Sequence, residues 1–388
     1  MRIIVVGAGE VGTYIADRLS RQEHDIALIE LDPERYRQVE AELDVLAING
    51  SGTDSAALKR AGIEEADLLV AATNKDEINL FSALLARQAG VGKTIVRVES
   101  RKLRSKEVTA LFEKFDDHLV IDPDQEVADS VLRLMEYPGA MDLSRMASEE
   151  VVIIGARLPA HAPLVGVSLH ALGRELDPDW DFIVGTITRK LENDDLEEVT
   201  IVPRQDEILK EGDLLRVICK SRALHDVTNR LGIARDVPRR ALLLGGGRTA
   251  EMIAESLLYR GVDVAIIEKK HERALELSES LAKALIYEGD VTDVEMLEEA
   301  DVARQDLVIA LTGEDDANVL ACLYAKSVSA QSKKNNSDDG IETIAVVHRL
   351  KLLDLLETNQ VDTALSPRTA TANSVLRFVR GDVESVAA

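Results

Sequence analysis

The sequence predicts an α/β protein in which two doubly wound parallel sheets flank a smaller α+β module. Three observations support this prediction. A glycine-rich turn directly follows the first apolar run, short apolar runs alternate with amphipathic segments, and both features return near residue 239. Strands and helices that alternate in this way form parallel sheets, because each helix carries the chain back to the start of the next strand.

The first unit has six predicted strands. Apolar runs place them at 2–6, 26–30, 45–48, 67–72 and 94–98, with a short one near 119–121. Between residues 140 and 235 the pattern of apolar and polar residues changes. The segments EEVVIIGARLPAHAPLVGVSL, WDFIVGTITRK and ILKEGDLLRVICK predict strands around a short helix. This middle stretch is therefore interpreted as a separate α+β module.

The first glycine-rich turn lies in RIIVVGAGEVG, residues 2–12, where Gly7, Gly9 and Gly12 separate a strand from a helix. Such glycines can form an ordinary tight turn, or they can let the backbone and the helix N–H groups bind a pyrophosphate. Glu30 ends the next predicted strand, eighteen positions after Gly12 (30 − 12). A carboxylate there accepts ribose hydroxyls and repels a 2′-phosphate, so this context favours a Rossmann-like nucleotide site.

The chain contains an internal repeat. RRALLLGGGRTAEMIAESLLYRGVDVAIIEKK, from Arg239, restates the opening at an offset of 238, so that Gly245, Gly247 and Glu268 match Gly7, Gly9 and Glu30. At an offset of 239, Thr73, Asp76 and Asn79 match Thr312, Asp315 and Asn318. A polar loop in SAQSKKNNSDDGIE follows, and DPDQEVADSVLRLM then faces SPRTATANSVLRFV at an offset of 244. The repeat therefore includes both ends of the unit.

The second turn departs from the first in ways that bear on its ligand. Ala250 replaces Gly12 and is expected to add a methyl group where helix, strand and pyrophosphate crowd together. Lys269 and Lys270 follow Glu268, which predicts either a more anionic ligand or an empty site. Gly246 is expected to give the backbone extra freedom. Arg248 is expected to point toward a phosphate.

Composition narrows the class of protein. The 388 residues include 46 Lys and Arg against 70 Asp and Glu, a net charge of −24, which disfavours nucleic acid and anionic lipid as partners. Cys219 and Cys322 lie far apart without a Cys or His companion, so neither a zinc site nor a disulfide framework is expected. The sequence shows no apolar run of membrane-spanning length and no signal segment, which predicts a cytoplasmic protein without direct membrane insertion.

The order of these parts, together with four short motifs, resembles the TrkA family. The motifs are VVGAGEVG, AATNKDEINL, EYPGA at Glu136 to Ala140, and KEGDLLRV. Members of this family are regulatory subunits of Trk-type bacterial potassium uptake and are built from RCK domains (regulator of conductance of potassium). The resemblance covers essentially the whole chain, and EYPGA after a linking helix is its most specific motif.

The resemblance implies two Rossmann-like RCK-N units that flank an RCK-C module. It places the first RCK-N unit with its linking helix at 1–135, the RCK-C module at 140–235, and the second RCK-N unit with its linking helix at 239–380. Family members carry another RCK-C module after the second unit. The sequence stops at GDVESVAA, so we expect that module to be absent here.

The resemblance also implies roles for individual residues. In the first unit, it assigns the pyrophosphate turn to Gly7, Gly9, Glu10, Val11 and Gly12, the ribose to Glu30, and the mouth of the crevice to Thr73 and Asn74. Arg97 takes the place of a family arginine and is expected either to neutralise a phosphate or to form a surface ion pair. The corresponding residues of the second unit are Gly245, Gly247, Arg248, Glu268 and Thr312.

The function that the resemblance implies is non-enzymatic. Such proteins bind NAD(H), ATP or ADP, assemble into a ring as homo-oligomers, and act on a potassium-transporting membrane subunit of the TrkH type. This chain would then lie at the inner face of the membrane, held there by the membrane subunit. No metal site and no catalytic residue are expected.

The alternative is an NAD-dependent oxidoreductase that uses the same turn. Such an enzyme needs a proton donor set against the nicotinamide. The seven histidines follow no partner pattern, and only His348, near the end of a predicted strand, is a candidate. The sequence therefore favours the regulator over the enzyme.

Pro123 and Pro367 each open a helix with an apolar stripe, and proline is favoured at the first helical position. In the first of these helices, at 124–135, the stripe contains Val127, Val131, Leu132 and Met135; the second helix lies at 368–379. Each stripe is expected to pack on its own domain or on a second chain. Self-association through these faces is the resulting prediction.

Overall fold

The computed structural model describes residues 1–104, 117–137, 140–146, 150–191, 194–234, 238–332, 340–356 and 361–379. Pro138 and Gly139 of EYPGA, residues 333–339 of the polar loop and the whole of GDVESVAA lie outside the described residues. Two compact units make up the chain: the first combines Met1–Val127 with Pro367–Arg380, and the second contains Ala128–Ser366. Each unit is described below by itself.

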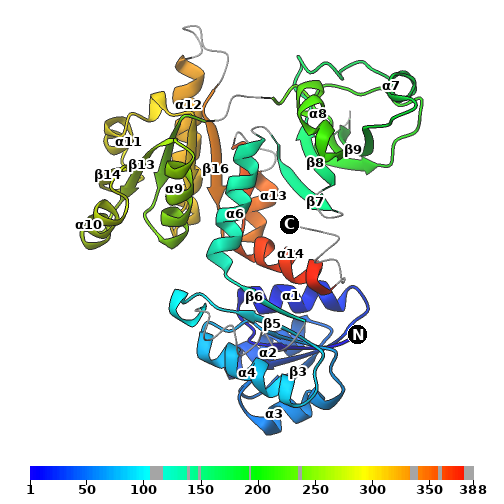
Figure 1. Ribbon diagram of the computed structural model, residues 1–388, viewed down its shortest axis with the longest axis vertical. Coiled ribbons are helices and arrows are strands. Elements are labelled where there is room, and N and C mark those ends of the chain that lie inside the picture. The colour runs from blue at the N-terminus through cyan, green and yellow to red at the C-terminus, as the bar shows by residue number, and fades with distance from the viewer. Residues whose placement is uncertain are drawn as a thin grey trace. The chain divides into compact units, whose positions relative to one another are not determined.

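The first unit contains a six-stranded parallel sheet in the order β3-β2-β1-β4-β5-β6. Its elements are β1 (Arg2–Val6), α1 (Glu10–Ser20), β2 (Asp25–Glu30), α2 (Pro33–Glu42), β3 (Leu46–Asn49), α3 (Ser55–Arg60), β4 (Leu68–Ala71), α4 (Asp76–Gln88), β5 (Lys93–Arg97) and β6 (His118–Ile121), with 3₁₀ turns at Ile63–Glu65 and Arg101–Arg104. The predicted strands are thus confirmed within one or two residues. Helices cover both faces of the sheet, which explains why β4 is apolar throughout and β1 is apolar after Arg2 (Figure 1).

A helix from the far end of the chain completes this unit. Helix α14 (Pro367–Val379) packs on α1, and its Ala372, Val375, Phe378 and Val379 are buried in the same core as Val11. Figure 1 shows α14, in red, along α1, in blue. The helix begins at Pro367 as predicted.

Helix α6 (Pro123–Glu136) likewise begins at the predicted proline. Its Val127, Val131 and Met135 are buried, and Leu132 is partly exposed. Much of the apolar face of α6 and of α14 is therefore buried within a single chain. Self-association through the remainder of these helices stays a prediction.

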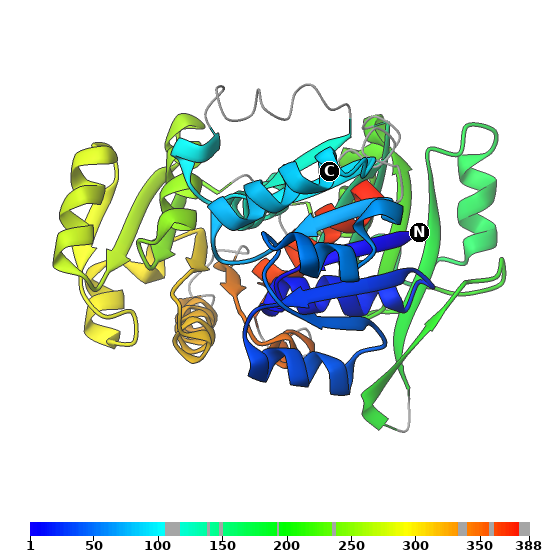
Figure 2. The same cartoon turned by 90° about the horizontal axis from the view of Figure 1, so that it is seen from below.

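The middle module is built on an antiparallel sheet in the order β10-β9-β11-β8-β7. Its elements are β7 (Asp142–Met146), β8 (Val151–Arg157), α7 (Leu169–Leu176), β9 (Phe182–Leu191), β10 (Asp194–Ile201), β11 (Leu214–Lys220), a 3₁₀ turn at Ser221–Ala223 and α8 (Leu224–Arg230). The strands are drawn in shades of green in Figure 2. Arg189 of β9 binds the carboxylate of the buried Asp213 through Nε and Nη2, both at 2.7 Å, which closes the loop before β11.

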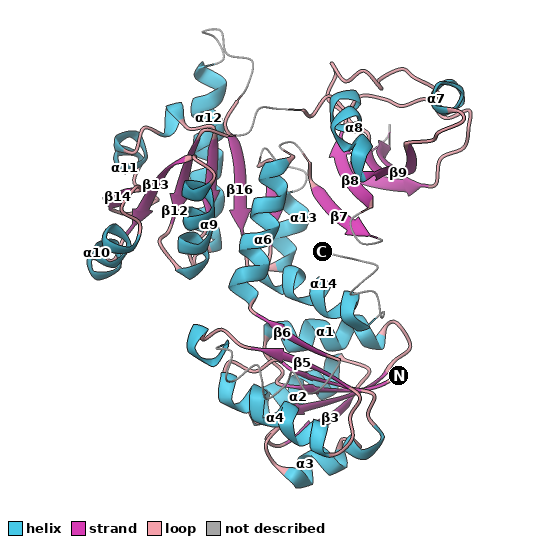
Figure 3. Cartoon of the chain, in the orientation of Figure 1, coloured by secondary structure: helices cyan, strands magenta, loops and turns pink. Residues whose placement is uncertain are grey.

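The second copy of the parallel sheet has the order β14-β13-β12-β15-β16-β17, which repeats the first sheet strand for strand. Its elements are β12 (Arg240–Leu244), α9 (Arg248–Tyr259), β13 (Asp263–Glu268), α10 (His271–Ser280), β14 (Leu285–Glu288), α11 (Val294–Glu299), β15 (Leu307–Ala310), α12 (Asp315–Ser332), β16 (Glu342–Val346), α13 (Leu350–Leu356) and β17 (Thr363–Leu365), with a 3₁₀ turn at Val302–Arg304. Figure 3 shows the alternation of helix and strand. In both sheets the order reverses beside the first strand, where open α/β sheets bind ligands.

Candidate functional site

The turn between β1 and α1 requires glycine at its first position. Gly7 has φ +99°, and its N–H donates to the carbonyl of Ile29 at 2.8 Å. A Cβ atom added to Gly7 would lie 2.8 Å from Cγ2 of Thr73 and in a backbone conformation that side chains disfavour. The turn is thus fixed between the ends of β2 and β4.

The third glycine allows α1 to approach the turn, because a Cβ on Gly12 would lie 2.0 Å from the carbonyl oxygen of Gly7. Gly9, the N-cap residue of α1, is different: a Cβ added there would have no neighbouring atom within 4 Å. Open space therefore borders the helix end, where backbone N–H groups and the helix dipole favour an anion. This cradle fits a pyrophosphate.

Glu30 closes one side of the first turn. Its side chain is buried, with 8% exposed, and Oε2 accepts the N–H of Ala8 at 2.5 Å while Oε1 accepts the N–H of Asp32 at 2.7 Å. Each carboxylate oxygen can accept a second hydrogen bond. The carboxylate is therefore held in a fixed orientation at the end of β2, the position predicted for the ribose contact.

A buried asparagine that was not among the predicted site residues fastens the ends of β4 and β5. Asn79 Oδ1 accepts the N–H of Thr73 at 2.9 Å and its hydroxyl at 2.6 Å, and Asn79 Nδ2 donates to the carbonyls of Thr73 and Arg97, both at 2.9 Å. Asn74, next in the loop, is exposed. The recurrence of Thr and Asn six positions apart in both repeats is the signal that could have found Asn79.

Three predicted residues of the first site make contacts within the protein itself. Arg97 donates from Nε to Oε1 of Glu99 at 3.0 Å, which is the ion pair that the alternative interpretation expected. Val11, in the first turn of α1, is buried in the core and packs there instead of lining the open side of the glycine turn. Glu10, the first residue of α1, pairs with Arg368 of α14.

The second turn repeats this geometry. Gly245 also has φ +99°, and Gly247 again has open space at its Cβ position. Glu268 accepts the N–H of Gly246 at 2.7 Å and that of Lys270 at 2.8 Å, as Glu30 does in the first unit. The second turn is therefore a complete cradle.

Two expectations about the second turn need correction. Ala250 is fully buried, so its methyl group lies in the protein interior and not on the open side of the turn. Gly246 does not have a positive φ; a Cβ there would lie 2.4 Å from Cδ1 of Leu277 and 2.9 Å from Oε2 of Glu268. Close packing, and not backbone freedom, accounts for this glycine.

One of the two lysines beside the second turn is paired. Lys269 Nζ lies 2.7 Å from Oδ2 of Asp290. The ammonium of Lys269, with the N–H and hydroxyl of Thr292, holds the pKa of Asp290 well below its usual value. Lys269 is therefore neutralised locally, which weakens the expectation that it recruits a more anionic ligand.

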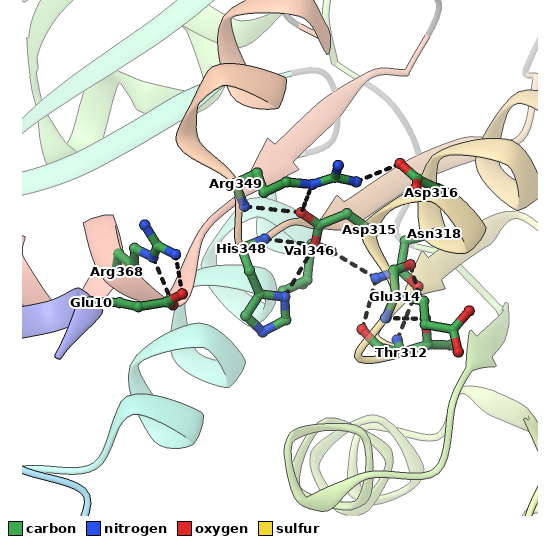
Figure 4. A network of polar contacts seen from close by, with 10 residues as sticks. All are labelled: Glu10, Thr312, Glu314, Asp315, Asp316, Asn318, Val346, His348, Arg349 and Arg368. Atoms are coloured by element: carbon green, nitrogen blue, oxygen red, sulfur yellow. Dashed lines mark hydrogen bonds and ion pairs between the residues drawn. The ribbon is translucent and has the colours of Figure 1, made fainter. Parts of the chain in front are cut away.

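A buried asparagine makes the same hydrogen bonds at the strand ends of the second unit (Figure 4). Asn318 accepts the N–H of Thr312 at 3.0 Å and donates to the carbonyls of Thr312 and Val346 at 2.9 and 2.8 Å. Val346 thus stands where the first unit has Arg97. The second site therefore lacks a cationic side chain at this strand end.

Asp315, at the start of α12, anchors the loop after β16 (Figure 4). Its carboxylate accepts the backbone N–H groups of His348 and Arg349 at 2.8 and 2.9 Å, and it contacts His348 Nδ1 at 3.1 Å. The histidine singled out from the sequence is therefore engaged with a buried carboxylate. Asp76 holds the loop after β5 in the same way, through the N–H groups of Glu99 and Ser100.

Comparisons with known proteins agree with this architecture. The TrkA-N domain model matches residues 3–123 and 241–367, and the TrkA-C domain model matches residues 153–232. The Trk system potassium uptake protein TrkA of Halomonas elongata is 31% identical over 100% of this chain and 81% of its own length. The chain belongs to the TrkA family.

Other TrkA relatives and solved structures extend this result. The TrkA homolog of Archaeoglobus fulgidus is 32% identical over 98% of this chain and 81% of its own length. The crystal structure of the GsuK RCK domain matches with a TM-score of 0.66 and 17% identity, over 98% of this chain and 76% of the other. The GsuK channel bound to NAD matches with a TM-score of 0.67 and 16% identity, over 99% of this chain and 64% of the other. At these identities the solved structures establish the RCK fold.

The described part of the chain has neither a candidate membrane span nor a candidate metal cluster. No helix within the described ranges combines the length and apolar character needed to cross a membrane. In the same part of the chain, no three His, Cys, Asp or Glu side chains come together in a group that could hold a metal ion.

Proposed function

We propose that this TrkA-family chain is a nucleotide-binding regulatory subunit that controls potassium transport by a membrane protein. The observation that carries the proposal is the duplicated turn: both units keep a glycine at φ +99°, an open glycine at the helix N-cap and a strand-end glutamate at the turn. Two relatives that match 98–100% of this chain, over 81% of their own length, are named potassium uptake proteins.

The proposed ligand of each turn is an adenine nucleotide, with NAD(H), ADP and ATP as the candidates. In the first unit, Gly7, Gly9 and Gly12 shape the pyrophosphate cradle, and Glu30 offers its remaining acceptor capacity to the ribose. Thr73, Asn74 and Arg97 lie at the strand ends that border the crevice. The nucleotide acts as an effector and leaves chemically unchanged.

Regulation then follows from differential binding. A nucleotide shifts a conformational equilibrium only as far as it binds one conformation better than the other, and a hundredfold preference corresponds to about 2.7 kcal/mol. In this proposal, helices α6 and α14 transmit the shift to neighbouring subunits of a homo-oligomeric ring, a dimer or a tetramer. The ring acts on a TrkH-like potassium-transporting membrane subunit, which holds the chain at the inner face of the membrane.

The oxidoreductase alternative requires a proton donor beside the nicotinamide. His348 is the candidate from the sequence, and its Nδ1 contacts the buried carboxylate of Asp315, which also binds two backbone N–H groups of the same loop. This arrangement supports a structural role for His348 and favours the regulator.

Calorimetric titration of the full chain with ADP and with NADH tests the proposal. We expect both nucleotides to bind and to be recovered unchanged, because the cradle is present and the regulator needs no turnover. Replacement Gly9→Val should abolish binding at one of the two sites, since the side chain would fill the open space of the first cradle. Steady consumption of either nucleotide that Gly9→Val reduces would favour the enzyme, and absence of binding would reject both functions.

A further inference from the structure

A residue near the C-terminal end of the described chain reaches the first glycine turn. Arg368, in the first turn of α14, donates from Nε to Oε2 of Glu10 at 2.8 Å, and its Nη2 pairs with Oε1 of the same carboxylate (Figure 4). Glu10 directly follows Gly9, the open position of the cradle. The contact is bidentate, which is the strongest geometry available to an arginine and a carboxylate.

The negative charge of Glu10 opposes phosphate binding at this position. A carboxylate suits the N-terminus of a helix, but there it competes with the phosphate that the cradle is proposed to bind and repels it. The side chain of Glu10 is 61% exposed, and that of Arg368 is 21% exposed. The guanidinium therefore supplies the positive charge that makes the mouth of the cradle acceptable to an anion.

Packing of α14 holds Arg368 in this position. Val375 and Phe378 on the same helix are buried against the core of the first unit, and Ser374 Oγ donates to Oε2 of Glu126. Lys93 lies 5.7 Å from the ring centroid of Phe378. Arg368 therefore stays beside Glu10 only while α14 is docked.

We propose that Arg368 is a positioning residue that makes docking of α14 a condition of tight nucleotide binding at the first turn. This inference rests on the proposed nucleotide function. With α14 docked, Glu10 is neutralised and the phosphate enters a cradle of positive potential. With α14 released, Glu10 repels the phosphate. Because binding linkage is reciprocal, a bound nucleotide stabilises the docked helix by the same factor.

The second turn has a different residue at this position. At the offset of the repeat, Arg248 occupies the place of Glu10, so the residue after the open glycine is a cation and not a carboxylate. The two turns are thus expected to differ in whether nucleotide affinity depends on a linking helix.

The test measures ADP affinity by calorimetry in full-length chains that also carry Gly247→Val, so that only the first turn binds. Gly247 has open space at its Cβ position and φ −62°, so this replacement is expected to fold. Arg368→Ala should weaken ADP binding about tenfold, a typical size for a coupling between two sites. Glu10→Gln should bind ADP at least as tightly as the parent, and adding it to Arg368→Ala should restore most of the lost affinity.

Arg377→Ala is the matched control, because it removes the same charge from the same helix but lies near Glu126. It should leave ADP affinity within about twofold of the parent. Hydrogen exchange supplies a second readout: ADP should slow exchange of the α14 amides in the parent and fail to do so in the Arg368→Ala chain. If the parent binds ADP and Arg368→Ala binds it equally well, the inference is wrong and the proposed function stands. If the Gly247→Val parent binds no nucleotide, nucleotide binding at the first turn is rejected together with the inference.

Discussion

Gly7 and Gly9 lie two residues apart but are glycines for different physical reasons. Gly7 has a positive φ and no room for a methyl group, whereas Gly9 has extended backbone and an open neighbourhood. Gly7→Ala should therefore lower the free energy of unfolding by roughly 1–2 kcal/mol, with a further loss from the contact with Thr73. Gly9→Ala should unfold like the parent and bind ADP more weakly. Thermal unfolding and calorimetry on the same two variants check this, and equal loss of stability in both would contradict it.

Glu30 is expected to select against a 2′-phosphate. Its carboxylate is fixed by two backbone N–H groups, so its remaining acceptor positions are available to ribose hydroxyls in charge-assisted hydrogen bonds worth roughly 1.5–3 kcal/mol each. In a Gly247→Val chain we expect NADH to bind at least about tenfold more tightly than NADPH. Glu30→Gln should weaken NADH binding and reduce the difference in affinity between NADH and NADPH.

Glu268→Gln, introduced into the same Gly247→Val chain, is the matched control, because Glu268 holds the same place in the second turn. It should leave the preference for NADH unchanged. If Glu30→Gln leaves NADH affinity unchanged, or if NADPH binds the parent as tightly as NADH, Glu30 serves only to fasten the turn.

At the scale of elements, buried polar side chains join helix starts to strand ends. Asn79 and Asn318 are fully buried, and each binds backbone groups at the ends of two neighbouring strands. Asp76 and Asp315 bind the loops that come next. Helices α4 and α12 are therefore tied to the crevice edge of their sheets, because buried backbone groups would be costly to leave without partners.

The Asp315 anchor makes a pH-dependent contribution to stability. Burial opposes its ionisation, but hydrogen bonds from the backbone N–H groups of His348 and Arg349, and then from their side chains, outweigh burial and lower the pKa to about 2 from 3.8. Because the folded-state pKa lies below the unfolded value, the stabilisation is fully present above 3.8 and is lost as the pH falls toward 2. Asp315→Asn should therefore cost about 2 kcal/mol near neutral pH and much less at about pH 2.

Denaturant unfolding at the two pH values measures this difference. Asp316→Asn is the control, because the neighbouring carboxylate is 78% exposed and pairs only with the exposed Arg349 in the described contacts. We expect it to change stability by less than about 1 kcal/mol at either pH. A loss for Asp315→Asn that does not depend on pH would show that the anchor acts through packing alone.

At the scale of the whole molecule, helix α14, at the end of the second repeat, completes the core of the first unit. Helix α14 lies in the core of the first unit, so a fragment ending near residue 140 would contain the first turn but would expose the apolar surface around Val11 and Ile15. We expect the fragment 1–136 to be less stable than the first unit of the full chain. A synthetic peptide of residues 367–380 should restore stability in trans and increase ADP affinity.

The matched control is the same peptide with Phe378→Ala. Loss of a buried phenylalanine typically costs about 3–5 kcal/mol, so this peptide should bind the fragment far more weakly. Thermal unfolding of the fragment with and without each peptide checks both expectations. A fragment that is as stable alone as with the peptide would show that α14 is not needed by the first unit.

Local sequence patterns predicted most of the fold and the core of each site. Apolar runs located the six strands of the first sheet, and Pro123 and Pro367 marked the starts of α6 and α14, because strand burial and proline geometry depend on neighbouring residues. The glycine turns and the strand-end glutamates could be found for the same reason. A positive φ at Gly7 and Gly245 is a local backbone requirement that only glycine meets easily.

Tertiary structure decided which surfaces meet. Sequence periodicity shows that α14 has an apolar face but not that α1 covers it, because the free energy of burial depends on apolar area and not on which partner supplies it. The Arg368–Glu10 pair joins residues 358 positions apart, and no local pattern connects them. The close packing that requires Gly246 and the ion pair between Lys269 and Asp290 likewise depend on atoms brought together only by the folded chain.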